Sequence, residues 1–184
     1  MSEHVPHPRL RLGHSTLLAR DLDAMLTFYC NALGFHVTNR GKVGEDAELA
    51  FLSQDPSHHH QIALVSGSPV PERAFMMLDH LAFRTGTLND LRSLHERLTM
   101  AGVTDILPIC HGNAWSLYFT DPEGNGVECY VDTPFHVAQP AAGGFDLAQT
   151  DEEILEATRA AFEGSPEFQP MDQWRQKFAH TLNE

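Results

Sequence analysis

The sequence repeats one order of expected elements, and this internal duplication limits the folds open to the chain more than any other feature. The first copy begins with a strand at residues 10–20, which contains His14. An amphipathic helix at 24–33 follows, with Gly34 placed to end it. Three more strands are expected at 35–40, 47–53 and 60–65, with a turn at 41–44. The order of the first copy is therefore β-α-β-β-β.

The second copy has the same order. A strand at 76–85 contains His80, and an amphipathic helix is expected at 88–100. Strands at 104–110, 115–120 and 127–131 complete it. An Asp-Pro turn recurs at the same place in both copies, at Asp55 and at Asp121. We therefore predict two tandem βαβββ modules, at 9–66 and 76–133, that together form one domain.

The last 51 residues, 134–184, depart from the repeat. A linker is expected at 139–144 because this stretch is rich in Pro, Ala and Gly. Helices are predicted at 150–162, with acidic residues in the first turn, and at 172–182. This tail is too short for a core of its own, so it packs on a sheet, covers a site or contacts a partner chain.

Composition excludes several classes of function. The chain of 184 residues has 12 Lys and Arg against 25 Asp and Glu, a net charge of −13, so binding to nucleic acid or to an anionic membrane is not expected. No apolar run approaches the roughly 18 residues of a membrane-spanning helix. The three cysteines are widely spaced, and an odd number argues against a disulfide framework. A cytoplasmic, reducing location is the expectation.

Glu128 is the one carboxylate in the otherwise apolar strand at 127–131. A buried carboxylate costs several kcal/mol, of order 5, unless it is paired or binds a metal. A side chain that points to solvent is the alternative. His14 and His80 hold the same position in the two copies, in the first strand of each module. Two imidazoles and one carboxylate are the ligands of the 2-His-1-carboxylate facial triad, which suits Fe(II).

A motif in the second module resembles one known superfamily. It runs Tyr-Phe-Thr-Asp-Pro-x-Gly-x-x-x-Glu, from Tyr118 to Glu128. Together with the two βαβββ modules and their opening histidines, it resembles the vicinal oxygen chelate superfamily of glyoxalases, bleomycin- and fosfomycin-resistance proteins, epimerases and type I extradiol dioxygenases. The resemblance covers about residues 9 to 137. It implies an α+β fold with a half-open mixed β-sheet around a metal site, with the helical tail added.

Within the superfamily, the chain is most similar to small, single-domain extradiol dioxygenases. His60 matches their active-site histidine that does not bind the metal, Tyr118 their active-site tyrosine, and residues 132–140 the segment after the ligand glutamate. The resemblance implies Fe(II) bound by His14, His80 and Glu128, or Mn(II) or another divalent metal in its place.

The same resemblance implies that His60 and Tyr118 are catalytic, with His60 as general base. The substrates would be a small aromatic diol and O2, and the protein a homo-oligomer. One departure is that many members have another histidine near the position of Asn113, whereas here only His111 is close.

Two other functions stay open. One is another metal-dependent enzyme of the superfamily, such as a glyoxalase-like lyase or a fosfomycin-resistance-type thiol transferase. The other is a metal-free drug-binding protein of the same fold. Analysis of the bound metal separates the second class from the enzymes.

Overall fold

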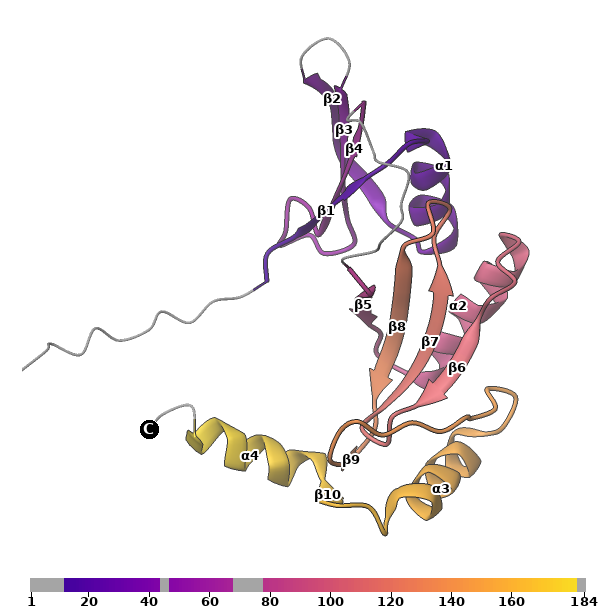
Figure 1. Ribbon diagram of the computed structural model, residues 1–184, viewed down its shortest axis with the longest axis vertical. Helices are drawn as coiled ribbons and strands as arrows, with labels where there is room; N and C mark the ends of the chain where they lie inside the picture. The colour runs from indigo at the N-terminus through magenta and orange to yellow at the C-terminus, as the bar shows by residue number, and fades with distance from the viewer. Residues whose placement is uncertain (1–11, 44–46, 68–77, 182–184) are drawn as a thin grey trace, which may run out of the picture. The chain divides into compact units, whose positions relative to one another are not determined.

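The computed structural model describes residues 12–43, 47–67 and 78–181. The ends of the predicted strands at 10–11 and 76–77 lie outside these ranges, as does residue 182 of the last predicted helix. The described residues form two compact units (Figure 1). One takes in the sheet of the first copy, and the other takes in everything from the second copy onward together with residues 31–33. Each unit is described by itself.

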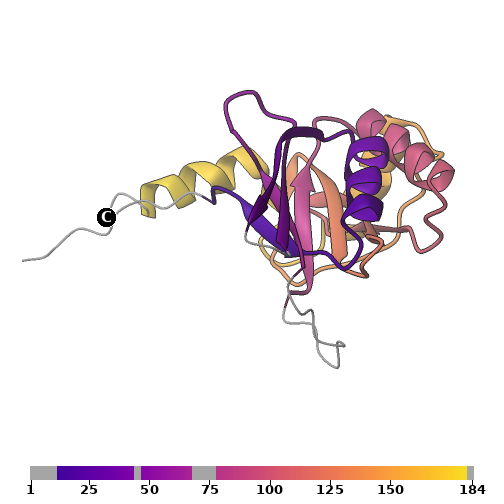
Figure 2. The ribbon, with the colours of Figure 1, turned by 90° about the horizontal axis from the view of Figure 1, so that it is seen from above.

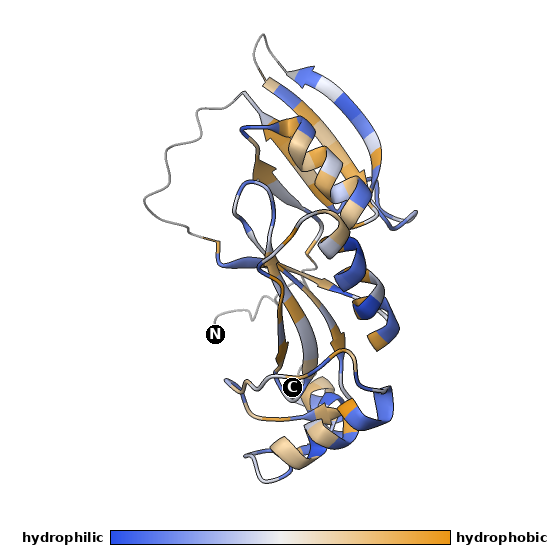
Figure 3. Cartoon of the chain, turned by 90° about the vertical axis from the view of Figure 1, so that its right-hand side faces the viewer, coloured by the Kyte–Doolittle hydropathy of each residue, from blue (hydrophilic) through white to orange (hydrophobic). Residues whose placement is uncertain are grey.

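The first unit contains a four-stranded mixed sheet. Its strands are β1 (Ser15–Leu18), β2 (His36–Val43), β3 (Ala47–Ser53) and β4 (Ile62–Ser66). They lie in the order β1-β4-β3-β2, with β1 parallel to β4 and the other pairs antiparallel. Figure 3 shows that the outer strand β2 is polar, whereas the inner strands are largely apolar. The buried residues of this sheet lie mainly on β3 and β4, among them Leu52 and Leu64.

The helix of the first unit begins at a cap and ends at a glycine. Asp21 accepts a 2.9 Å hydrogen bond from the Ala24 N–H and so caps α1 (Leu22–Thr27). The chain continues as the π-helical turn η1 (Phe28–Ala32). It stops at Gly34, whose φ of +80° is open to glycine at little cost. Met25 and Tyr29 are fully buried where the helix lies against the sheet (Figure 2).

The second unit repeats this sheet. Its strands are β5 (His80–Arg84), β6 (Leu107–Cys110), β7 (Ala114–Thr120) and β8 (Gly126–Asp132). The order is β5-β8-β7-β6, with β5 parallel to β8. The helix α2 (Leu88–Met100) starts with a capping box of Thr87 and Asp90, and it packs on β7 and β8 through the buried Leu91 and Leu98. The α+β fold and the repeated strand order are confirmed.

Strand pairing decides which side chains share a face. Tyr118 on β7 and Ala82 on β5 are both opposite Glu128 on β8. Because side chains alternate along a strand, Tyr118 and Glu128 lie on one face of the sheet. Leu117 and Cys129 lie on the other face and are buried. Cys129 therefore belongs to the core.

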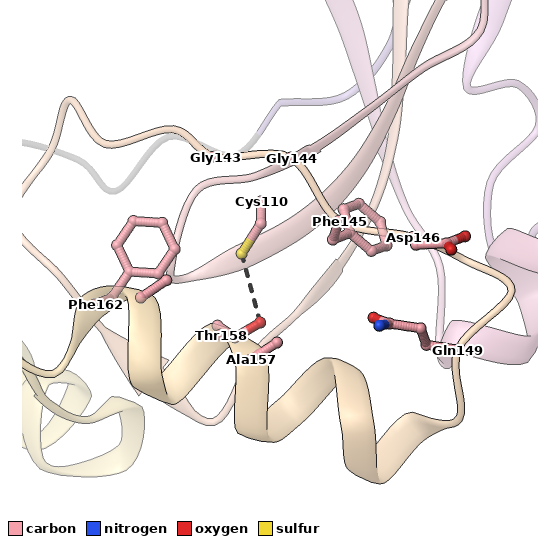
Figure 4. A pocket seen from close by; sticks show the side chains of 10 residues that line it. Cys110, Gly143, Gly144, Phe145, Asp146, Gln149, Ala157, Thr158 and Phe162 are labelled. Carbon is pink, nitrogen blue, oxygen red and sulfur yellow. Dashed lines mark hydrogen bonds between the residues drawn. The ribbon is translucent and has the colours of Figure 1, made fainter.

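The tail packs on the second unit. It contains β9 (Phe135–His136), α3 (Asp151–Phe162), β10 (Gln169–Pro170) and α4 (Met171–Thr181), and β9 pairs with β10 (Figure 1). The Trp115 indole donates a 2.8 Å hydrogen bond to the Thr158 hydroxyl of α3. A cavity of about 370 Å³ lies between α3 and the chain at 143–149, with Cys110 in its wall (Figure 4). The structure thus shows the tail packed on a sheet, the first of the three alternatives, and leaves the contact with a partner chain untested.

Three local expectations are wrong. Residues 41–43 continue β2 and form no turn. The stretch at 139–144 is no free linker, because Gly143 pairs with Cys110 through backbone hydrogen bonds of 2.7 and 2.8 Å. His14 and His60 were expected inside strands, but they precede β1 and β4 by one and two residues. Among the described residues, no helix is long and apolar enough to cross a membrane.

Candidate metal centre and substrate hollow

Glu128 is the centre of a polar cluster in the second unit. Its side chain is buried on β8, with the residue only 8% exposed. One carboxylate oxygen, Oε2, lies 3.2 Å from His80 Nε2. The other, Oε1, accepts a 2.8 Å hydrogen bond from the Tyr118 hydroxyl. The alternative that Glu128 points to solvent is therefore wrong, and both of its oxygens have polar partners.

The His80 and Glu128 pair fits a divalent metal ion. Two neighbouring ligand atoms at about 2.1 Å from an ion are about 3 Å apart when they subtend a right angle. The 3.2 Å between His80 Nε2 and Glu128 Oε2 has this spacing. His80 Nδ1 lies 2.6 Å from the Asp79 carboxylate, which places a proton on Nδ1, and Nε2 is the ring nitrogen that faces Glu128. A carboxylate behind a ligand histidine is common at metal sites.

No third ligand joins this pair in the structure. Within the ranges that the structure describes, no three His, Cys, Asp or Glu side chains are grouped to hold a metal ion. His14, the third predicted ligand, belongs to the first unit. The full set of His14, His80 and Glu128 stays a prediction.

Tyr118 is held as a protonated phenol. Burial, and then the neighbouring Glu128 carboxylate, raise the pKa of its hydroxyl well above its usual range. At neutral pH the group therefore keeps its proton and acts as a hydrogen-bond donor. Tyr118 and Glu128 thus meet on one hairpin, and the catalytic role of Tyr118 stays a prediction.

His111 extends the cluster, and sequence reasoning gave it no role. Its Nε2 lies 3.0 Å from the Tyr118 hydroxyl. Its Nδ1 lies 2.8 Å from the Ala141 carbonyl, so Nδ1 carries a proton, because a carbonyl only accepts. Gln139 Nε2 donates a 2.9 Å hydrogen bond to the His111 carbonyl. These contacts join residues about thirty positions apart, and no local pattern signals them.

An open hollow of about 380 Å³ adjoins this cluster on the second unit. Glu128 and Tyr118 are part of its wall. Its other lining residues are Ala82, His111, Asn113, Ala114, Tyr130 and Gln139. No Lys or Arg is among them. The hollow is thus a place for a small molecule next to the proposed ligands.

The first unit brings His14 and His60 together. The centroids of their rings are 4.4 Å apart, and the Phe51 ring lies 4.9 Å from that of His60. His60 Nδ1 is 3.0 Å from His59 Nδ1. Desolvation, and then the nearby His14 and His59, lower the pKa of His60 below its usual range. His60 is therefore a neutral imidazole at pH 7 and able to accept a proton.

The fold, the repeat and the motif from Tyr118 to Glu128 define a family. The chain belongs to the Glyoxalase/Bleomycin resistance protein/Dioxygenase superfamily, whose sequence model matches residues 11–129. The chain is 39% identical over 126 residues to biphenyl-2,3-diol 1,2-dioxygenase 3 of Rhodococcus globerulus, a match that covers 66% of this chain and 63% of that protein. It is 33% identical over 139 residues to catechol-2,3-dioxygenase of Bacillus subtilis, covering 70% and 44%.

The chain therefore spans less than two thirds of the length of these relatives. Among solved structures, a glyoxylase/bleomycin resistance protein/dioxygenase domain from Frankia sp. EAN1pec is 27% identical, with a TM-score of 0.60 over 70% of this chain and 96% of that one. The fosfomycin resistance protein FosX from Listeria monocytogenes, complexed with Mn(II) and sulfate, shares the fold at 22% identity. Its TM-score is 0.52, over 67% of this chain and 93% of that one.

Proposed function

We propose that this protein is a metal-dependent extradiol dioxygenase that opens the ring of a catechol-type aromatic diol with O2. In this proposal His14, His80 and Glu128 hold a divalent ion, with Fe(II) the expected metal. The observation that carries the proposal is the buried Glu128 carboxylate, 3.2 Å from His80 Nε2 and hydrogen-bonded to Tyr118. A buried anion between a histidine and a phenol is costly unless a cation balances it.

In this proposal, the residues of the second unit bind the metal and orient the diol. An iron ion, when bound, would supply Lewis acidity toward the diol hydroxyls and a site for dioxygen. Asp79 contacts Nδ1 of His80 and so orients the ring. The other ring nitrogen, Nε2, then faces the Glu128 carboxylate. The Tyr118 phenol keeps its proton and donates it in a hydrogen bond, which in the proposal is shared with a diol oxygen.

His60 is proposed as the general base. Its neutral imidazole takes a proton from a diol hydroxyl and later returns one during ring opening. The lowered pKa of His60 suits the first of these steps, because the free base is the main form at neutral pH. Nδ1 of His60 contacts His59, so Nε2 of His60 is the atom assigned to the proton transfer.

The relatives support the choice of substrate. Two of them are named as biphenyl-2,3-diol 1,2-dioxygenases and one as a catechol-2,3-dioxygenase, at 33% to 39% identity. All three names refer to an aromatic diol with two neighbouring hydroxyls. A hollow of about 380 Å³ beside Glu128 and Tyr118 has room for such a ring.

The test is a direct assay. Protein loaded anaerobically with Fe(II) is mixed with O2 and either catechol or biphenyl-2,3-diol, while O2 uptake and the yellow ring-opened product are followed. Stoichiometric O2 uptake with product formation is expected. Iron-loaded protein that turns over no diol, or that is active only with a thiol cosubstrate, would contradict the proposal.

Single substitutions separate the proposed roles. His80→Ala should abolish metal binding, whereas His60→Ala should keep the metal and lower kcat by about 100-fold or more. His36→Ala, at an exposed position on β2, is the matched control and should change neither quantity. Equal loss of metal in His60→Ala and His80→Ala would overturn the role given to His60.

A further inference from the structure

The hollow is lined by one polar side chain that has no hydrogen-bond partner among the described residues. His111, Tyr118 and Glu128 bond to one another, and the Tyr130 hydroxyl interacts with Arg84. The Gln139 carboxamide donates to the His111 carbonyl and accepts from the Ala141 N–H at 3.0 Å. Among the described residues, only the Asn113 carboxamide makes no hydrogen bond while lining this hollow. It offers one acceptor and two donor hydrogens to a ligand.

Asn113 is held on a rigid turn. Gly112 and Asn113 form the two-residue loop of the β6–β7 hairpin, closed by a 2.8 Å hydrogen bond from the His111 N–H to the Ala114 carbonyl. Gly112 has φ of +76°, as a glycine at the first loop position allows. The Thr133 N–H and hydroxyl donate to the carbonyls of Asn113 and Gly112, at 3.0 and 2.6 Å. A group on such a turn selects ligands well because little freedom is lost on binding.

The position of Asn113 corresponds to the far end of a bound diol. Tyr118 and Ala114 both line the hollow and lie four residues apart on β7, a span of about 13 Å at roughly 3.3 Å per residue. A single catechol ring beside Tyr118 leaves the end at Ala114 and Asn113 free. A diol with a second ring or a chain of similar length reaches that end.

The charges near this end are already paired. The Arg84 guanidinium lies 5.6 Å from the centre of the Tyr130 ring and 3.4 Å from the Asp132 carboxylate. Arg175 of α4 lies 2.6 Å from the same carboxylate. Since no Lys or Arg lines the hollow, an anionic substituent there meets no cation among the lining residues.

We propose that Asn113 determines substrate specificity, by selecting aromatic diols whose substituent ends in an uncharged hydrogen-bonding group such as a hydroxyl. The free carboxamide at the far end of the hollow carries this inference. It rests on the proposed function, which places the diol beside Glu128 and Tyr118.

The test uses three probes: biphenyl-2,3-diol and its derivatives with a para-hydroxyl or a para-carboxylate on the second ring. In the wild type, kcat/KM for the hydroxyl derivative should exceed that for the parent diol by about 3- to 10-fold, the range for one neutral hydrogen bond. The carboxylate derivative should be the poorest of the three. Asn113→Leu, similar in size but apolar, should abolish the preference for the hydroxyl, and Asn113→Lys should raise the relative rate of the carboxylate derivative.

The controls separate this inference from the proposed function. Asn89→Leu, at an exposed position of α2, should keep the wild-type ratios. Anaerobic dissociation constants for the same three probes report selection even without turnover. Turnover of none of the probes would count against the proposed function, whereas a hydroxyl preference that persists in Asn113→Leu, in rates and in dissociation constants, would overturn the role of Asn113.

Discussion

At the residue scale, the account depends on a few side chains around Glu128. Its oxygens contact His80 and Tyr118, and Tyr118 in turn contacts His111. This chain of contacts ends at the Ala141 carbonyl, so residues from the tail help to orient the phenol. Tyr118 and His111 are therefore positioned by contacts to Glu128 on one side and to the Ala141 carbonyl on the other.

Tyr118→Phe tests this arrangement. The change removes the O–H that donates to Glu128 but leaves the ring and the proposed ligands in place. Iron content should stay at the wild-type level while kcat for catechol falls by about 100-fold, as for the loss of one well-placed donor. Metal analysis and steady-state O2 uptake measure the two quantities. An unchanged kcat would show that the phenol takes no part in the reaction.

The sequence predicted much of this cluster and missed one member. Glu128 stood out as the one charge in an otherwise apolar strand. Tyr118 was implied by the resemblance, through the motif that ends at Glu128. His111 did not, because its position depends on Gln139 and Ala141, and contacts across about thirty residues leave no periodic signal.

At the element scale, a buried hydroxyl of α3 is hydrogen-bonded to β7. Thr158 accepts from the Trp115 indole at 2.8 Å and donates to the Ile154 carbonyl at 2.8 Å. Thr158→Val should cost about 1–3 kcal/mol in the free energy of unfolding, because a buried indole N–H is left without a partner. Thr158→Ser keeps the hydroxyl and is the control. Urea unfolding followed by tryptophan fluorescence measures both, and equal effects would contradict this explanation.

The start of α3 predicts a dependence on pH. Hydrogen bonds from the backbone and side chain of Thr150 hold the pKa of Glu153 below its usual value of 4.5. A carboxyl whose pKa is lower in the folded state adds stability above its unfolded pKa and loses it as the pH falls through the folded pKa. Wild type should therefore exceed Glu153→Gln in urea midpoint above pH 5, and the difference should shrink below pH 4.5. A difference that is constant from pH 7 to pH 3 would contradict this assignment.

The elements themselves were largely predictable. The helix at 88–100 and the strand at 47–53 have the predicted bounds, since capping residues and period-2 alternation are local signals. The stretch at 139–144 was mistaken for a linker because its composition is typical of loops. Its pairing with Cys110 arises from tertiary contact, which composition does not encode.

At the scale of the whole molecule, the duplication explains both the repeated sheet and the matching positions of His14 and His80 in the two copies. Each copy forms its own four-stranded mixed sheet, as expected from the repeat. His14 and His60 lie together in the first unit, and His80, Tyr118 and Glu128 in the second. The homo-oligomer expected from the resemblance stays a prediction, which light scattering of the purified protein tests.

The central claim is that His14, His80 and Glu128 bind one divalent ion. Anaerobic titration with Fe(II), followed by metal analysis, measures it in the wild type, in His14→Ala, His80→Ala and Glu128→Ala, and in the His36→Ala control. About one ion per chain is expected for the wild type and the control, with affinity lowered at least 10-fold in each of the other three. Wild-type affinity in His14→Ala or in Glu128→Ala would contradict the claim.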